Sequence, residues 1–300
     1  MSVTIAVPEK VIARFVVTAD LVPEDIPSMI RQCLPTQYTD SVTERLGTPL
    51  LDVSEHQAVE SHCGLENVTA SDADDLKKVQ GAARHIHLTS VLPATDLPHG
   101  LHLARVATEA LAESLCSVPV DLDTARVLPG NPFDRPERFL LADEWLGVSL
   151  PSYRSAGACP AKADDIDGCA CVDLRTRGLP RFGLPDLEIT DVACAHDLAA
   201  LNILRTTAQR VLPLGRHPGK HILSAELLLS SDDFSGFWGA HGPLWEDGPL
   251  PVRLAKVGSS RLSVQAPEDF PGTLNEWLWD ELPPILHELL SCEPDDLHPT

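Results

Sequence analysis

The most constraining feature of this chain is a strictly alternating stretch, Cys169–Arg177. Its even positions hold uncharged side chains (Ala170, Val172, Leu174, Thr176), whereas its odd positions hold two cysteines and every charged side chain (Cys169, Cys171, Asp173, Arg175, Arg177). Because successive side chains of a strand point to opposite faces, the stretch predicts a strand with one buried face and one polar face. A turn-rich segment, 178–185, leads to a second strand expected over 186–192, so the two strands predict a hairpin with a long connection.

Hydrophobic periodicity elsewhere predicts helices mixed with further strands. Helices are expected over 23–34, 71–83, 97–115, 195–212 and 273–282, and strands over 12–18, 85–92, 118–127 and 220–229. This order favours an α+β fold, in which a mixed or mainly antiparallel sheet carries helices mostly on one face, as in a two-layer sandwich. We expect one composite domain over 12–266, followed by a C-terminal helical segment and acidic tail over 267–300.

The charge of the chain restricts its partners. With 23 basic and 44 acidic residues the net charge is −21, and a field of that sign repels nucleic acid and anionic membrane surfaces. No stretch approaches the roughly 18 apolar residues of a membrane span, and residues 1–10 lack the pattern of a signal peptide. We therefore expect a cytoplasmic protein that binds neither nucleic acid nor membrane.

A cysteine and histidine set on the predicted hairpin is a candidate metal site. Cys169 and Cys171 share a strand face, and Cys194 and His196 lie just past the end of the partner strand. Three thiolates and an imidazole form a chemically sensible tetrahedral set for zinc. The Cys-x-Cys spacing differs from that of zinc fingers, and small buried cysteines with a capping histidine explain the same residues.

A second candidate is the charged strand face with Asp173, Arg175 and Arg177, joined by Arg181 in the following loop. Two arginines at i and i+2 could clamp a carboxylate or phosphate, which predicts a site for a small anionic ligand. The alternative interpretation is a ladder of cross-strand salt bridges with Asp186 and Glu188.

Two further groups of residues invite a functional interpretation. His85 and His87 share a predicted strand face, and His99 and His102 share a helix face, so a metal site or ordinary surface histidines are both possible. Tryptophans gather in the last third of the chain (Trp238, Trp245, Trp277, Trp279), where they could anchor a protein interface or fill a core.

The chain lacks the common catalytic signatures. It has no Gly-x-Gly-x-x-Gly loop, no phosphate-binding loop with its Lys-Ser/Thr ending, no Gly-x-Ser-x-Gly elbow, and no His-Glu-x-x-His motif. These absences leave an enzyme possible, because catalytic groups are assembled by geometry rather than by sequence order.

Two segments, Arg138–Trp145 and Arg177–Leu187, resemble stretches of uncharacterised proteins of high-GC bacteria, and the similarity runs over about residues 84–211. That group has no assigned activity, so the resemblance implies no site and no chemistry. The sequence thus favours a protein that binds a protein partner or a small anionic ligand. The alternative is a metal-assisted, hydrolase-like enzyme that uses Cys169, Cys171, Cys194 and His196.

Overall fold

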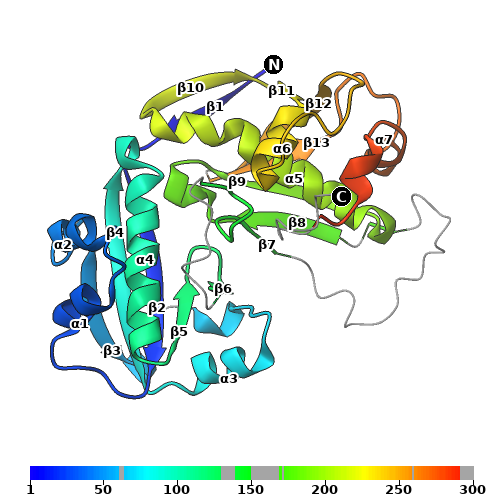
Figure 1. The fold of residues 1–300 in the computed structure, drawn as a ribbon. Coiled ribbons are helices and arrows are strands. Elements are labelled where there is room, and N and C mark those ends of the chain that lie inside the picture. The colour runs from blue at the N-terminus through cyan, green and yellow to red at the C-terminus, as the bar shows by residue number, and fades with distance from the viewer. Residues whose placement is uncertain (61–63, 130–138, 150–168, 171, 259, 291–300) are drawn as a thin grey trace, which may run out of the picture.

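The computed structural model describes residues 1–60, 64–129, 139–149, 169–170, 172–258 and 260–290. These residues form an α+β fold, as predicted, but their strands are distributed over three sheets rather than one. Figure 1 shows the two larger sheets in different parts of the molecule, each with helices packed against it.

The N-terminal sheet has five strands that pair antiparallel throughout. Their spatial order is β3 (Asp52–Gln57), β4 (Arg84–Pro93), β2 (Lys10–Ala19), β5 (Val118–Asp121) and β6 (Arg126–Val127). The long helix α4 (His99–Ser114) packs on one face, and α1 (Ile26–Cys33) and α2 (Thr39–Arg45) pack against α4. Helix α3 (Ala73–Gly81) covers part of the opposite face, where Val79 contacts the valines of β5.

The second sheet has six strands and contains the alternating stretch. Its order is β11 (Glu226–Leu229), β12 (Leu250–Val257), β13 (Arg261–Gln265), β9 (Asp186–Val192), β8 (Val172–Arg177) and β7 (Gly147–Ser149). Only β13 and β9 pair in parallel among these described strands. Helix α5 (Asp197–Val211) covers one face and α6 (Ser231–Trp238) packs on α5. The opposite face therefore carries the polar side chains of β8, β9 and β13.

Shorter elements complete the fold. Strands β1 (Ser2–Val7) and β10 (Gly219–Ser224) form a separate two-stranded antiparallel ribbon, and α7 (Leu274–Asp280) follows the second sheet. Single 3₁₀ turns lie between the larger elements: η1 (Ala58–Glu60), η2 (Leu65–Asn67), η3 (Ala94–Asp96), η5 (Leu179–Phe182), η6 (Cys194–His196), η7 (Leu212–Arg216) and η8 (Pro284–His287). No helix among the described segments is long and apolar enough to cross a membrane.

The hairpin predicted from the alternating stretch is confirmed, since β8 and β9 pair antiparallel around η5. Two other segments were each predicted as one strand, and in the structure each forms two strands. The strand expected over 118–127 is interrupted by a turn in which the carboxylate of Asp121 accepts the amides of Asp123 and Thr124. The strand expected over 220–229 is two strands in different sheets, because Ala225 bonds to Met1 on one side and to Leu254 on the other.

A buried ion pair joins the two large sheets. The guanidinium Nη1 of Arg181, in η5, donates to Asp121 Oδ2 at the end of β5 over 2.5 Å, and both side chains are completely buried. Arg181 Nη2 also donates to the carbonyl oxygen of Trp145. Around this pair a single hydrophobic core continues from the N-terminal sheet into the second one. The sheets are thus connected by both apolar packing and paired charge.

Candidate functional site

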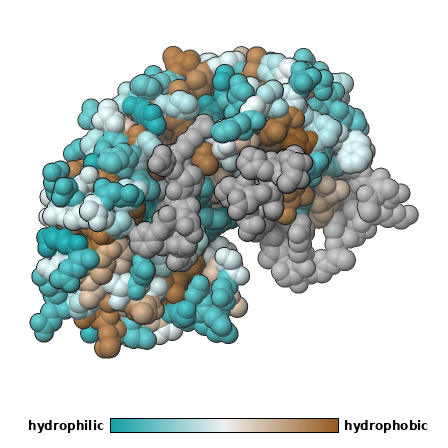
Figure 2. Space-filling model, in the orientation of Figure 1, coloured by the Kyte–Doolittle hydropathy of each residue, from teal (hydrophilic) through white to brown (hydrophobic). Residues whose placement is uncertain are grey.

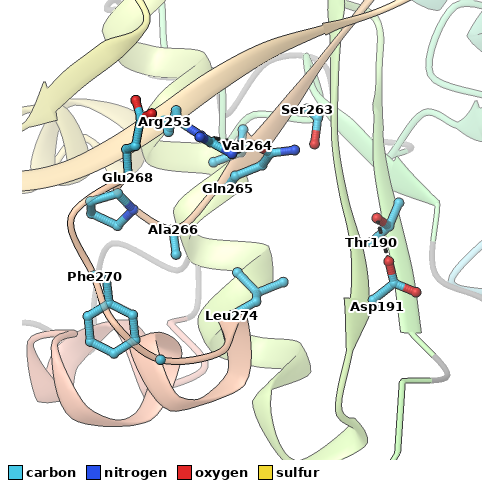
Figure 3. A pocket seen from close by; sticks show the side chains of 12 residues that line it. Thr190, Asp191, Arg253, Ser263, Val264, Gln265, Ala266, Glu268, Phe270 and Leu274 are labelled. Atoms are coloured by element: carbon cyan, nitrogen blue, oxygen red, sulfur yellow. Dashed lines mark hydrogen bonds between the residues drawn. The ribbon is translucent and has the colours of Figure 1, made fainter.

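A crevice opens where the two parallel strands β9 and β13 separate. Their pairing runs from Arg261 and Asp186 to Ser263 and Glu188. Beyond that point β13 stays paired with β12 and β9 with β8, but the two strands no longer pair with each other. The cavity between them has a volume of about 420 Å³, which is within the usual range for small-molecule sites. Figure 3 shows Ser263 on one strand and Thr190 on the other, on either side of the opening. In sheets with parallel strands, crevices at the carboxyl ends of the strands are common ligand sites.

A backbone irregularity shapes one wall of this crevice. Val172 pairs with Val192 and Leu174 with Ile189, so β9 has one residue more than β8 between these two pairs. Within this bulge Asp191 has a φ of 61°, which is unusual for a residue other than glycine. Asp173 Oδ1 accepts the Asp191 amide at 3.2 Å. Such bulges redirect side chains next to binding sites, and here Thr190 and Asp191 both line the crevice.

The opposite wall holds an arginine fixed in place. Both Nε and Nη2 of Arg253 donate to Gln265 Oε1, at 3.1 and 2.7 Å. These two residues are directly paired across β12 and β13. The remaining nitrogen, Nη1, has no hydrogen-bond partner among the described residues and can donate to a ligand. Because the guanidinium is held by two bonds, little side-chain freedom is lost when a ligand binds.

The floor of the crevice is apolar and its rim is acidic. Ala266, Phe270 and Leu274 line the floor, and Figure 3 shows Phe270 and Leu274 at the end away from Ser263. The exposed carboxylates of Asp191 and Glu268 lie at the edges. The lining is more polar than that of a typical small-molecule site, and it combines apolar side chains with polar groups that are held in place.

The buried end of β9 is held by α7. Asn275, in α7, accepts the amide of Ala193 at 2.8 Å and donates to the carbonyl oxygen of Asp191 at 3.5 Å. Since Leu274 precedes Asn275, the same helix contributes to the crevice floor. The bulge, the floor and α7 therefore form one braced unit.

The residues of the predicted arginine face lie in different environments in the structure. Asp173 and Arg175 are exposed on the polar face of β8, and the guanidinium of Arg175 lies 3.4 Å from Glu188, which also pairs with Arg261. The expected cross-strand salt bridge therefore forms at Glu188. Asp186 instead accepts from Thr176 Oγ1 and from the amide of Leu179. Arg177, beside Gly147, is half-buried.

Arg181 lies apart from that face. Its guanidinium is committed to Asp121 and Trp145 in the interior, so it cannot join Arg175 and Arg177 around a ligand. Arg181 is buried together with its hydrophobic neighbours Leu179 and Phe182, whereas Pro180 of the same turn is exposed. The sequence identified the loop but could not show that its arginine turns inward.

The predicted metal site is partly brought together. The Sγ atoms of Cys169 and Cys194 lie 3.5 Å apart, whereas Cys171 lies outside the described residues. His196 is buried, and its ring lies 5.8 Å from that of Trp279. Among the residues that the structure describes, no three His, Cys, Asp or Glu side chains form a ready metal-binding group.

The four histidines considered together in the sequence fall on two sides of the N-terminal sheet. His85 and His87 lie on β4 with His56 of β3 beside them, and the rings of His56 and His87 are 4.8 Å apart. Burial, followed by repulsion from His56, lowers the pKa of His87 to about 4. His99 and His102 are on α4, where His102 Nε2 is bonded to the hydroxyl of Tyr38.

The C-terminal tryptophans do not form one exposed cluster. Trp277 and Trp245 are buried in the hydrophobic core, Trp238 is half-buried, and Trp279 is exposed. The space-filling view shows hydrophobic side chains in separate groups among hydrophilic ones on the visible face (Figure 2). The filling of a core therefore accounts for most of these aromatic residues.

The crevice itself was missed by the sequence interpretation. Residues 261–265 alternate polar and apolar side chains, and residues 250–257 are mostly apolar with Arg253 and Lys256 among them. These patterns could have identified β13, with Gln265 on its polar face, and a neighbouring strand that carries Arg253. The alternation could not show that β13 lies beside β9. No family model, no curated protein and no solved structure matches this chain, and the resemblance over residues 84–211 stays a prediction.

Proposed function

We propose that this protein binds a small organic anion in the crevice between β9 and β13. The observation that supports this most strongly is Arg253, whose guanidinium is oriented by Gln265 at the wall of a 420 Å³ cavity with an apolar floor. The anionic group of the ligand would accept from Arg253 Nη1, and its apolar body would pack on Phe270 and Leu274. Thr190 and Ser263 offer hydroxyl groups for further hydrogen bonds.

The surroundings favour a small ligand over a large anionic one. The chain has a net charge of −21, and the carboxylates of Asp191 and Glu268 lie beside the opening. A nucleic acid would meet repulsion along its length, whereas a compact anion can sit inside the crevice beside Arg253, the one cationic side chain among the described residues that line it. The large exposed hydrophobic side chains lie on separate elements, for example Ile12 on β2, Ile222 on β10 and Leu228 on β11. This scatter gives less support to a protein interface. We also propose the cytoplasm as its location.

The probe for this proposal is 1-anilinonaphthalene-8-sulfonate, an aromatic anion whose fluorescence rises in apolar surroundings. Its uncharged counterpart, N-phenyl-1-naphthylamine, has the same rings without the sulfonate. We expect Arg253→Gln to weaken binding of the sulfonate about tenfold or more, because a hydrogen bond to a charged group contributes about 1.5–3 kcal/mol. The uncharged probe should bind the variant and the parent equally.

Arg175→Gln is the matched control, since Arg175 lies on the same sheet but does not line the crevice. It removes the same charge from the chain and should leave sulfonate binding unchanged. The proposal is wrong if Arg253→Gln leaves the affinity for the sulfonate unaltered, or if both arginine variants reduce it equally. Equal losses would indicate a general effect of net charge.

A further inference from the structure

Two cysteines far apart in the sequence meet at one end of the β8–β9 hairpin. Cys169 precedes β8 and Cys194 follows β9. Because the strands are antiparallel, the start of β8 lies beside the end of β9, and the two Sγ atoms are 3.5 Å apart. Both residues are half-buried. The hairpin thus creates a local dithiol.

The distance between the sulfur atoms helps to identify what the dithiol could hold. Two thiolates bound at about 2.3 Å to one tetrahedral zinc ion lie about 3.8 Å from each other. Two sulfur atoms joined in a disulfide lie about 2.05 Å apart. In the metal-free chain the Cys169 thiol donates a hydrogen bond to Cys194 Sγ, and the 3.5 Å of that contact is much closer to the first value than to the second. The spacing therefore fits two ligands of one metal ion better than it fits a covalent bond.

A hydrogen bond to sulfur points to the same chemistry. The backbone amide of Cys194 donates to Cys169 Sγ over 3.2 Å. Amides directed at sulfur stabilise its negative charge, as hydrogen bonds around metal-bound ligands commonly do. Cys194 also begins η6, which continues directly into α5. The backbone that supplies this amide is therefore held by the helix that follows it.

We propose that Cys169 and Cys194 together bind a thiophilic divalent metal ion of the zinc class. Both residues would bind as thiolates, so that binding releases the thiol protons to the solvent and involves no change of oxidation state. The two sulfur atoms are the protein ligands that the geometry defines, and water or other donors complete the coordination. Next to the site, the amide of Ala193 is bonded to Asn275, so the bound ion would fix the chain end that leads to Asp191 in the crevice.

The test uses the reduced, metal-free full chain and Cd²⁺ as the probe. Cadmium bound by thiolate gives an ultraviolet charge-transfer band, and the band should rise with the first equivalent and fall when Zn²⁺ competes for the site. Cys169→Ser and Cys194→Ser should each remove this first, tightest equivalent. Cys116→Ser is the control, since Cys116 is exposed in the turn after α4 and should leave the titration unchanged.

A second measurement needs no variant and therefore does not depend on the variants folding. Zn²⁺ should slow the alkylation of Cys169 and Cys194 by iodoacetamide, as mapped on peptides by mass spectrometry, and leave Cys116 equally reactive. Equal alkylation of the pair with and without Zn²⁺ would overturn the proposal. A disulfide between Cys169 and Cys194 in protein purified without oxygen would also overturn it. Neither measurement involves the crevice, so both outcomes are independent of the anion proposal.

Discussion

At the scale of single residues, burial and hydrogen bonding have opposite effects on the pKa of the Asp186 carboxyl group. Burial raises its pKa to about 6, although the bonds from Thr176 and Leu179 and the charge of Arg181 act in the opposite direction. The unfolded chain ionises this group near its ordinary value of 3.8. The folded state therefore holds its proton more strongly than the unfolded state, and ionisation of Asp186 destabilises the fold.

The sign of the pH dependence follows from this difference. The contribution of Asp186 to the free energy of unfolding should be fully present below about pH 4 and should be lost as the pH rises through 6. The fall is about 3 kcal/mol at most. Asp186→Asn keeps the acceptor oxygen and removes the charge. We expect the variant to lack this fall and to be more stable than the parent at pH 7.5, in urea unfolding followed over pH 4–8.

Asp20→Asn is the comparison, because Asp20 is exposed at the end of β2. That variant should follow the parent over the same pH range. If Asp186→Asn kept the full decrease between pH 4 and 6, another group would be its source. Asp123 is the first alternative, since burial also raises the pKa of its carboxyl group.

At the scale of elements, the close contact between η5 and η7 depends on one glycine. A Cβ atom on Gly215 would overlap the carbonyl oxygen of Phe182. Backbone cannot move aside as a flexible side chain can, so we expect Gly215→Ala to lower the free energy of unfolding by about 1–3 kcal/mol. Urea unfolding of the purified variant measures this loss.

For Gly81→Ala we expect the opposite effect on the free energy of unfolding. Gly81 is the last residue of α3, and a Cβ there meets nothing within 4 Å. The change should raise stability by up to about 1 kcal/mol, since alanine is the better helix former. Equal effects of the two substitutions would contradict the contact inferred between η5 and η7.

The elements also show what the sequence can and cannot predict. The β8–β9 hairpin was predictable because its alternation and its turn are local features. The parallel neighbour of β9 was not, because the alternation of Arg261–Gln265 reports a strand and its faces but not its partner. The crevice depends on that distant pairing, and so the sequence did not predict Arg253 and Thr190 as site residues. By contrast, the proximity of Cys169 and Cys194 could be predicted from the sequence, because a single hairpin connects them.

At the scale of the whole molecule, the ion pair of Arg181 and Asp121 is a buried charged link between the two large sheets. Asp121→Ala would leave a fully buried guanidinium without its 2.5 Å partner and would also remove the acceptor of two turn amides. The loss of one partner of a buried pair costs about 3–5 kcal/mol. We expect a loss of this size in urea unfolding, with Glu55→Ala as the comparison.

The ion pair of Glu55 and Arg84 has a similar contact distance, 3.0 Å, but both side chains are more than one third exposed. Its removal should cost less than about 1 kcal/mol, because water already solvates both charges. The Asp121→Ala variant should still unfold in one transition, since one hydrophobic core extends through both sheets. Two separate transitions would show instead that the sheets are independent units held together mainly by Arg181 and Asp121. A loss no larger than that of Glu55→Ala would show that the apolar core alone joins them.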